Sequence, residues 1–286
     1  MKQTTENVYF SALLPKCYPV DSANLFAALA EHGVHYDFLE GTKDIWVRDF
    51  MPIAKTRQFQ RQKCIYFKYE PSYLHDSLEL RTDFAREVFP YLQEKTRVGE
   101  YVASNINLDG GNVVISPDET KAIISDRVFR ENADLNEKVL LCTLDEVLEM
   151  EIIIIPSLLS DMTGHADGMV RFVDDCTVAC NGPLSPYGLE NKVKKALSHH
   201  GLDTVDFPYK DSGGYSAVGC YLNFLETEQT IFLPIFGIAN DEEAIRAAKC
   251  IFAKEIVPVL IPQIAADGGG LHCVSWQMNV QNDSEG

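Results

Sequence analysis

Three consecutive parts of the chain repeat one pattern of hydrophobic and polar positions. In each part, two short runs rich in apolar and β-branched residues precede an amphipathic helical segment and a third such run. The pattern predicts strands at 112–116 and 121–125, a helix at about 144–150 and a strand at 151–156; strands at 169–173 and 177–180, a helix from 185 to 200 and a strand at 203–207; and strands at 219–225 and 230–233, a helix from 240 to about 253 and a strand at 257–261.

Local signals support the helix starts. Thr143 and Glu146 form a capping box, Ser185-Pro186 is typical of a helix opening, and Asn240 is placed to cap the last helix. The N-terminal part continues the theme, with a helix at about 22–32 capped by Asp21, strands at 35–39 and 64–69, a strand-like run at 41–53 and a helix at about 77–92.

A repeat of roughly 50–60 residues is the signature of an architecture built from similar units. The N-terminal part supplies a fourth ββαβ unit, and the two termini together would supply a fifth. No linker or compositional break divides the chain, so we expect an α/β fold in which residues 1–286 form a single domain with internal pseudo-symmetry.

Composition excludes some classes of protein. The net charge is −17 and no basic patch stands out, which argues against a nucleic-acid partner and suits a cationic ligand. The eight cysteines form no CxxC pair, and we find neither a signal-peptide pattern nor an apolar run of membrane-spanning length. We therefore expect a cytoplasmic protein with reduced thiols and without a membrane partner, and homo-oligomer formation is left open.

Polar or glycine-rich motifs recur once in each predicted unit, about every 50–60 residues, at 46–49, 109–112, 164–167, 221–224 and 270–273. In a circular array of similar units, equivalent positions converge on the axis. This spacing predicts one central pocket that contains Asp49, Asp109, Asn112, His165, Asp167 and Cys273.

Taken one at a time, these residues leave alternatives open. Cys273 follows three glycines and could be a nucleophile or a buried structural thiol. His165 and Asp167, with Cys273, would also make a plausible zinc set. Asp109 and Asn112 could mark only a turn, and Trp46 could belong to the core or flank a cation.

Taken together, the motifs resemble those of the agmatine deiminase and bacterial peptidyl-arginine deiminase family of guanidino-group-modifying enzymes. The matching segments are Trp46-x-Arg48-Asp49-x-x-Pro52, Asp109-Gly-Gly-Asn112, Gly164-His165-x-Asp167 and Gly269-Gly270-x-His272-Cys273. The resemblance covers most of the chain. It implies a pentein-type, five-bladed α/β propeller of ββαβ units with pseudo-fivefold symmetry, in agreement with the repeat.

The resemblance also implies roles for individual residues. Cys273 would attack the guanidinium carbon, Asp49 and Asp167 would hold the guanidinium nitrogens, and His165 would act as general acid and base. Trp46, Asp109, Asn112 and Gly270 would contact the substrate. The expected reaction is hydrolysis of a small cationic guanidine, most simply agmatine to N-carbamoylputrescine and ammonia, with no metal or other cofactor.

Departures from the family pattern leave other substrates open. Met51 stands where a glycine is common, and the segment after Cys273 contains Gln277 but no proline. The alternatives are free, methylated or peptidyl arginine as the substrate, amidinotransfer on the same scaffold, a non-catalytic binding propeller and a zinc hydrolase.

Overall fold

The computed structural model describes residues 4–55, 63–96, 101–182 and 188–281. Within them the strands form five three-stranded sheets. The sheets are, in order, β15(Trp276–Gln281)–β1(Thr4–Ser11)–β2(His35–Leu39), β3(Ile53–Lys55)–β4(Lys63–Lys68)–β5(Tyr101–Asn107), β6(Val113–Ile115)–β7(Lys121–Ser125)–β8(Glu151–Ile155), β9(Val170–Phe172)–β10(Thr177–Gly182)–β11(Asp203–Pro208) and β12(Leu225–Glu226)–β13(Thr230–Ile235)–β14(Glu255–Leu260).

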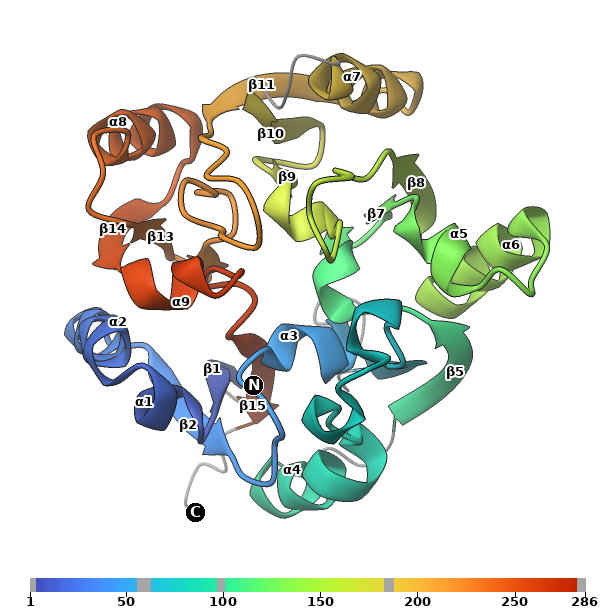
Figure 1. The fold of residues 1–286 in the computed structure, drawn as a ribbon, viewed down its shortest axis with the longest axis horizontal. Helices are drawn as coiled ribbons and strands as arrows, with labels where there is room; N and C mark the ends of the chain where they lie inside the picture. Colours follow the sequence, from blue (N-terminus) through green and yellow to red (C-terminus); the bar gives the residue numbers. More distant parts are fainter. Residues whose placement is uncertain (1–3, 56–62, 97–100, 183–187, 282–286) are drawn as a thin grey trace.

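All five sheets have the same topology. The middle strand is antiparallel to the first strand and parallel to the third. A parallel pair needs a crossover connection, which here contains α2(Pro19–Glu31), α4(Phe89–Thr96), α6(Glu137–Leu148), α7(Leu189–His199) or α8(Asp241–Ile251). Figure 1 shows the sheets arranged around a centre with these helices on the outside.

Two of the crossover helices, α6 and α7, each bury one narrow apolar stripe. The buried residues lie four positions apart, as Leu140, Leu144 and Leu148 in α6 and as Val193 and Leu197 in α7. Residues four apart share one helix face, so these stripes explain the amphipathic periodicity of the sequence. The expectation of an α/β fold is confirmed.

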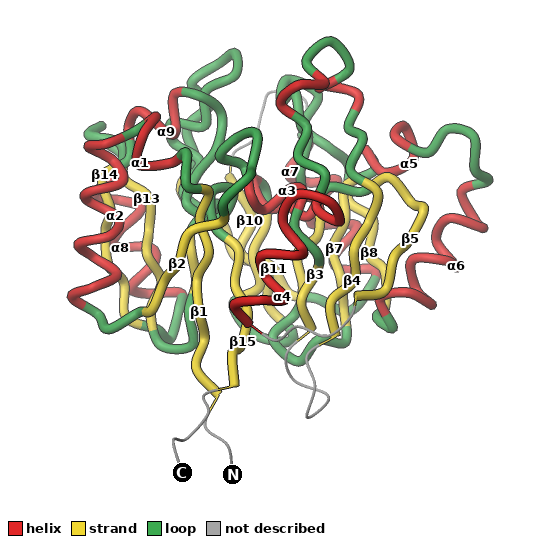
Figure 2. The backbone as a smooth tube through the Cα atoms, turned by 90° about the horizontal axis from the view of Figure 1, so that it is seen from below, coloured by secondary structure: helices red, strands yellow, loops and turns green. Residues whose placement is uncertain are grey.

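Strand β15 closes the ring by pairing antiparallel with β1 near the N-terminus. Figure 2 shows β1 and β15 side by side, extending away from the long loops. A second contact joins the ends, because the buried Asp21 carboxylate accepts hydrogen bonds from the backbone of Gln263 and Ile264 at the start of α9(Pro262–Ala266), at 2.8 and 2.9 Å. The two terminal segments therefore complete one unit together.

Several expected elements are wrong in detail. Asp21 lies inside α2 and does not cap it, since its side chain is used at α9. Thr143 lies inside α6, which begins after Asn136, and Thr143 bonds the Val139 carbonyl instead. Asn240 precedes α8 but makes no side-chain cap; Asp241 instead accepts from the backbone of residues 236–238.

Two segments near the centre have a different conformation from the expected one. The run at 41–53 contains the short helix α3(Val47–Phe50) and only then β3. At 219–225 the chain is mostly loop, with β12 beginning only at Leu225, and the Asn223 side chain in this loop accepts two backbone N–H groups of the Cys273 segment. The expected helix at 77–92 is broken into the 3₁₀ turn η2(Leu78–Leu80), the π-helical turn η3(Phe84–Val88) and α4.

The predicted opening at Ser185-Pro186 lies outside the described residues, and α7 begins at Leu189. Among the helices in the described ranges, none combines the length and the apolar character that a bilayer crossing requires.

Candidate active site

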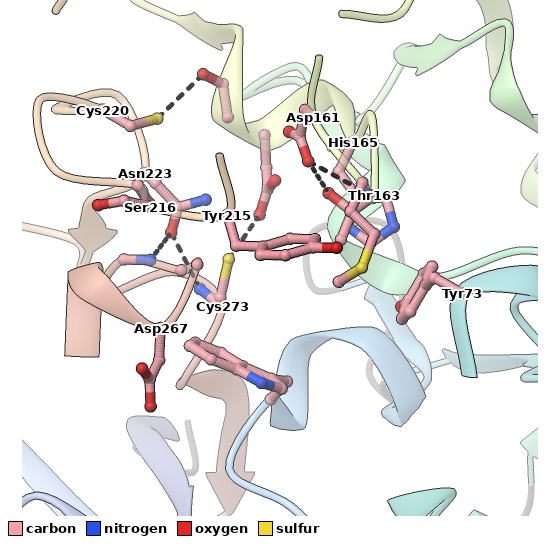
Figure 3. Close-up of a pocket in the computed structure, with 18 of the residues that line it drawn as sticks. Tyr73, Asp161, Thr163, His165, Tyr215, Ser216, Cys220, Asn223, Asp267 and Cys273 are labelled. Carbon is pink, nitrogen blue, oxygen red and sulfur yellow. Dashed lines mark hydrogen bonds between the residues drawn. The ribbon is translucent and has the colours of Figure 1, made fainter. Parts of the chain in front are cut away.

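A cavity of about 420 Å³ lies where the connections of several units meet. Segments far apart in the sequence line it, namely residues within 44–49, 69–80, 158–169, 209–223 and 267–273. Figure 3 shows Cys273, Asn223 and Asp267 on one side of this cavity and His165, Thr163 and Tyr73 on the other, with Tyr215 extending between them. The predicted residues Trp46, Asp49, His165, Asp167, Gly270 and Cys273 all line the cavity.

The backbone before Cys273 is held by Asn223. The Asn223 Oδ1 accepts hydrogen bonds from the N–H of Gly270 at 3.1 Å and of Cys273 at 3.2 Å. A Cβ atom on Gly269 would lie 2.2 Å from Cζ3 of Trp46, and one on Gly270 would lie 2.6 Å from the Asn223 carbonyl oxygen. Such distances exclude a side chain, so two of the three glycines serve close packing behind the thiol.

Asp167 links the thiol to His272. Its Oδ2 accepts a hydrogen bond from His272 Nδ1 at 2.7 Å and lies 3.8 Å from Cys273 Sγ. Burial, Arg48 and Arg171 lower the pKa of His272 to about 3, so His272 donates as a neutral imidazole. Although burial alone would raise the pKa of Asp167, the hydrogen bond from His272 and nearby positive charge hold it below its usual value.

His165 lies between two further carboxylates. Its Nε2 donates to Asp109 Oδ2 at 2.8 Å, and its Nδ1 is 3.5 Å from Asp49 Oδ1. Burial would lower the pKa of His165, but Asp49 and Asp109 raise it to about 10. Burial and the nearby carboxylates raise the pKa of Asp49 to about 8 against the opposing effect of His165. A cation bound here would relieve this repulsion.

Gly111 packs closely against the side chains of Asp49 and His165. A Cβ atom there would be 2.5 Å from Asp49 Oδ1 and 2.7 Å from His165 Nδ1. The Gly111 N–H instead donates to Asp49 Oδ1 at 3.2 Å. The glycine pair of the segment 109–112 therefore has a packing role that the motif alone did not reveal.

Asp109 and Asn112 are not among the residues that line the cavity. Asp109 contacts His165, and Asn112 Oδ1 accepts hydrogen bonds from the backbone of Ser125 and Ala166. In this structure both residues support the groups that line the cavity, and their expected contact with substrate stays a prediction. In the described part of the chain, no three His, Cys, Asp or Glu side chains are arranged to hold a metal ion, and this includes the alternative zinc set.

Sequence analysis assigned no role to Tyr73, Asn223 or His272. Tyr73 stands in no motif, and its hydroxyl group reaches Asp109 only through the fold. His272 and Asn223 belong to the recurring motifs, and their even spacing was the available signal.

The Cys273 thiol should be slow to react in the free protein at neutral pH. Burial, Asp167 and Asp49 raise its pKa well above the ordinary value, so the thiol stays protonated. We expect iodoacetamide to modify Cys273 at pH 7 more slowly than the exposed Cys176 and Cys250, with the rate rising as pH increases. Mass spectrometry of each cysteine peptide measures this, and fastest modification of Cys273 at pH 7 would contradict it.

Comparison with known proteins places this geometry in a family. Residues 20–279 match the model of the Porphyromonas-type peptidyl-arginine deiminase family. Among solved structures, agmatine deiminase of C. jejuni has a TM-score of 0.75 at 19% identity, with 98% of this chain and 94% of that chain covered. Its C315S variant with substrate bound has a TM-score of 0.73 at 18% identity, with the same coverage.

Agmatine deiminase of Enterococcus faecalis is similar at a TM-score of 0.72 and 17% identity, with 96% of this chain and 93% of that chain covered. These structures share the α/β pentein-type fold with this protein. Because the family model spans nearly the whole sequence, the chain belongs to the Porphyromonas-type peptidyl-arginine deiminase family.

Proposed function

We propose that this protein hydrolyses a small cationic guanidine, agmatine, to N-carbamoylputrescine and ammonia. The observation that carries the proposal is the convergence of the Cys273 thiol with Asp49, Asp167 and His165 in one cavity. Paired carboxylates match the N–H groups of a planar guanidinium, and a thiol is a suitable nucleophile for its carbon. The solved agmatine deiminases of the same fold, one of them with substrate bound, support this assignment.

The reaction follows from the positions of these groups. Asp49 and Asp167 hold the guanidinium, and its positive charge favours the Cys273 thiolate, which the two carboxylates otherwise oppose. Because His165 is already protonated, the thiol proton passes to solvent when the substrate binds. The thiolate attacks the guanidinium carbon, and His165 protonates the departing ammonia. The resulting thiouronium is then attacked by water, which gives its proton to the now neutral His165. Collapse of this adduct breaks the carbon–sulfur bond, and the hydroxyl proton passes to the Cys273 sulfur, which releases the ureido product and restores the thiol.

The charge of the cavity favours agmatine over arginine. Acidic residues line it at Asp44, Asp161, Asp211 and Asp267, and among the described lining residues Lys210 is the one lysine or arginine. Burial raises the pKa of Asp44 to about 7. The ammonium group of agmatine suits such surroundings, whereas the α-carboxylate of free arginine would need a cationic partner.

The proposal also includes the arrangement of the blades, the number of domains and the cellular compartment of the enzyme. Five three-stranded sheets of one topology support a five-bladed propeller with pseudo-fivefold symmetry, formed by residues 1–286 as a single catalytic domain. The cysteines are free thiols, in keeping with a cytoplasmic enzyme.

Ammonia release from a panel of guanidines tests the substrate. Agmatine, free arginine, dimethylarginine and a blocked arginine peptide are compared at equal concentration, with and without an added amine acceptor. We expect agmatine to have the highest kcat/KM and water to be the acceptor. A higher kcat/KM for arginine or a peptide would show that agmatine is not the preferred substrate. Transfer of the amidine group to the added amine would show that the enzyme is an amidinotransferase and not a hydrolase.

A further inference from the structure

A short 3₁₀ turn, η1(Ser72–Leu74), brings a tyrosine to the Asp109–His165 pair. The Tyr73 hydroxyl group donates to Asp109 Oδ2 at 2.9 Å, and the same oxygen accepts from His165 Nε2 at 2.8 Å. The rings of Tyr73 and His165 are 6.1 Å apart in an edge-to-face arrangement, and Figure 3 shows the two side chains near each other at the cavity. One carboxylate oxygen is therefore shared between the two donors.

Residues of α5(Arg127–Glu131) fix this turn from the neighbouring unit. Glu131 accepts hydrogen bonds from the Ser72 backbone N–H at 2.9 Å and from the Ser72 hydroxyl at 2.7 Å. Arg127 is paired with Glu131 at 2.8 Å and donates to Ser72 Oγ at 3.0 Å, and its guanidinium lies 5.4 Å from the centre of the Tyr73 ring. These contacts hold Tyr73 in one orientation toward Asp109.

We propose that Tyr73 is a positioning residue of the deimination, which shares the Asp109 oxygen with His165 and thereby orients the imidazole and weakens its attachment to the carboxylate. The inference rests on the proposed function, in which His165 must give its proton to ammonia and later take one from water. A histidine held too strongly as a cation would be a poor base in the second step.

The charges around the pair determine the direction of the effect. Asp49, Asp109 and Asp167 face His165, and Arg127 and the buried Tyr69 face Tyr73. Burial, Asp109 and Tyr69 raise the pKa of Tyr73 well above its usual value, so its hydroxyl group remains a donor. Without this donor, His165 would be the remaining side-chain donor to Asp109 Oδ2 among the described residues, and the pKa of His165 would rise further.

The test is the pH dependence of kcat for Tyr73→Phe with agmatine. The variant keeps the ring under Arg127 and removes only the hydroxyl group. We expect the limb of the pH–kcat profile that reports the ionisation of His165 to move to higher pH by roughly 0.5–1 unit. We expect kcat at pH 7 to fall by roughly 3–10-fold. KM should change little, because the guanidinium is held by Asp49 and Asp167.

Tyr221→Phe is the matched control. It removes another buried tyrosine–aspartate hydrogen bond, from Tyr221 to Asp241 Oδ1 at 2.8 Å, away from His165. The control should lose stability without moving the pH limb. A Tyr73→Phe enzyme that is folded and whose limb coincides with that of the wild type would overturn the proposal, since a purely structural role lowers activity equally at every pH.

A second measurement separates this inference from the proposed function. Titration of ¹⁵N-labelled histidine by NMR reports His165 in the free protein, with its signal identified by loss in His165→Gln. If wild-type protein releases no ammonia from any guanidine, the proposed function fails, yet a higher midpoint for His165 in Tyr73→Phe would still support the link through Asp109. An unchanged midpoint would refute it whatever the substrate.

Discussion

Replacement of Cys273 by serine is expected to lower ammonia release from agmatine by about 10³-fold or more. A serine hydroxyl is not ionised near neutral pH, and its oxygen is a much weaker nucleophile than sulfur. The binding groups remain, because Asp167 is held by His272 and the Cys273 backbone N–H by Asn223. The variant should therefore still bind agmatine, which isothermal titration calorimetry measures.

Cys176→Ser, which changes an exposed cysteine, is the control and should retain wild-type turnover. Thermal unfolding midpoints of both variants check that the fold is intact. Turnover by Cys273→Ser at more than a few per cent of the wild-type rate would eliminate the covalent mechanism. Failure to bind agmatine would instead point to a role for the sulfur in forming the cavity.

His165→Gln is expected to lower kcat by about 10²–10⁴-fold, the range for loss of a general acid–base group. The glutamine amide can still donate to Asp109 but cannot carry a proton between ammonia and water. Because Asp49 and Asp109 raise the pKa of His165 to about 10, the free enzyme holds it protonated at neutral pH, ready to act first as an acid. The variant should lose the pH limb that this group produces.

His35→Gln provides the comparison, since His35 lies exposed on β2. It should leave both kcat and its pH profile unchanged. A His165→Gln enzyme that keeps the wild-type pH profile, even at reduced rate, would show that another group transfers the proton.

The repeat was predictable because it depends on local patterns. Leucines four apart in α6 report which face of the helix is buried, whatever the partner. The continuous buried runs of β7 and β10 mark middle strands that are covered on both faces. Errors arose where a distant side chain decides the local conformation. The Asp21 side chain accepts a hydrogen bond at α9 and does not cap its own helix, and the Asn223 side chain binds the Cys273 segment from a loop where a strand was expected.

The sequence by itself determined the order of the units, the chemical types that meet at the centre and the resemblance that joins Cys273, His165, Asp49 and Asp167. Tertiary structure alone decided how these groups are connected. It joins Asp109 to His165 and His272 to Asp167 through hydrogen bonds, and it packs Gly111 against Asp49. The partners of His165 and Asp167 come from segments 56 and 105 residues away, so burial and charge, which fix their pKa values, exist only once the units have packed together.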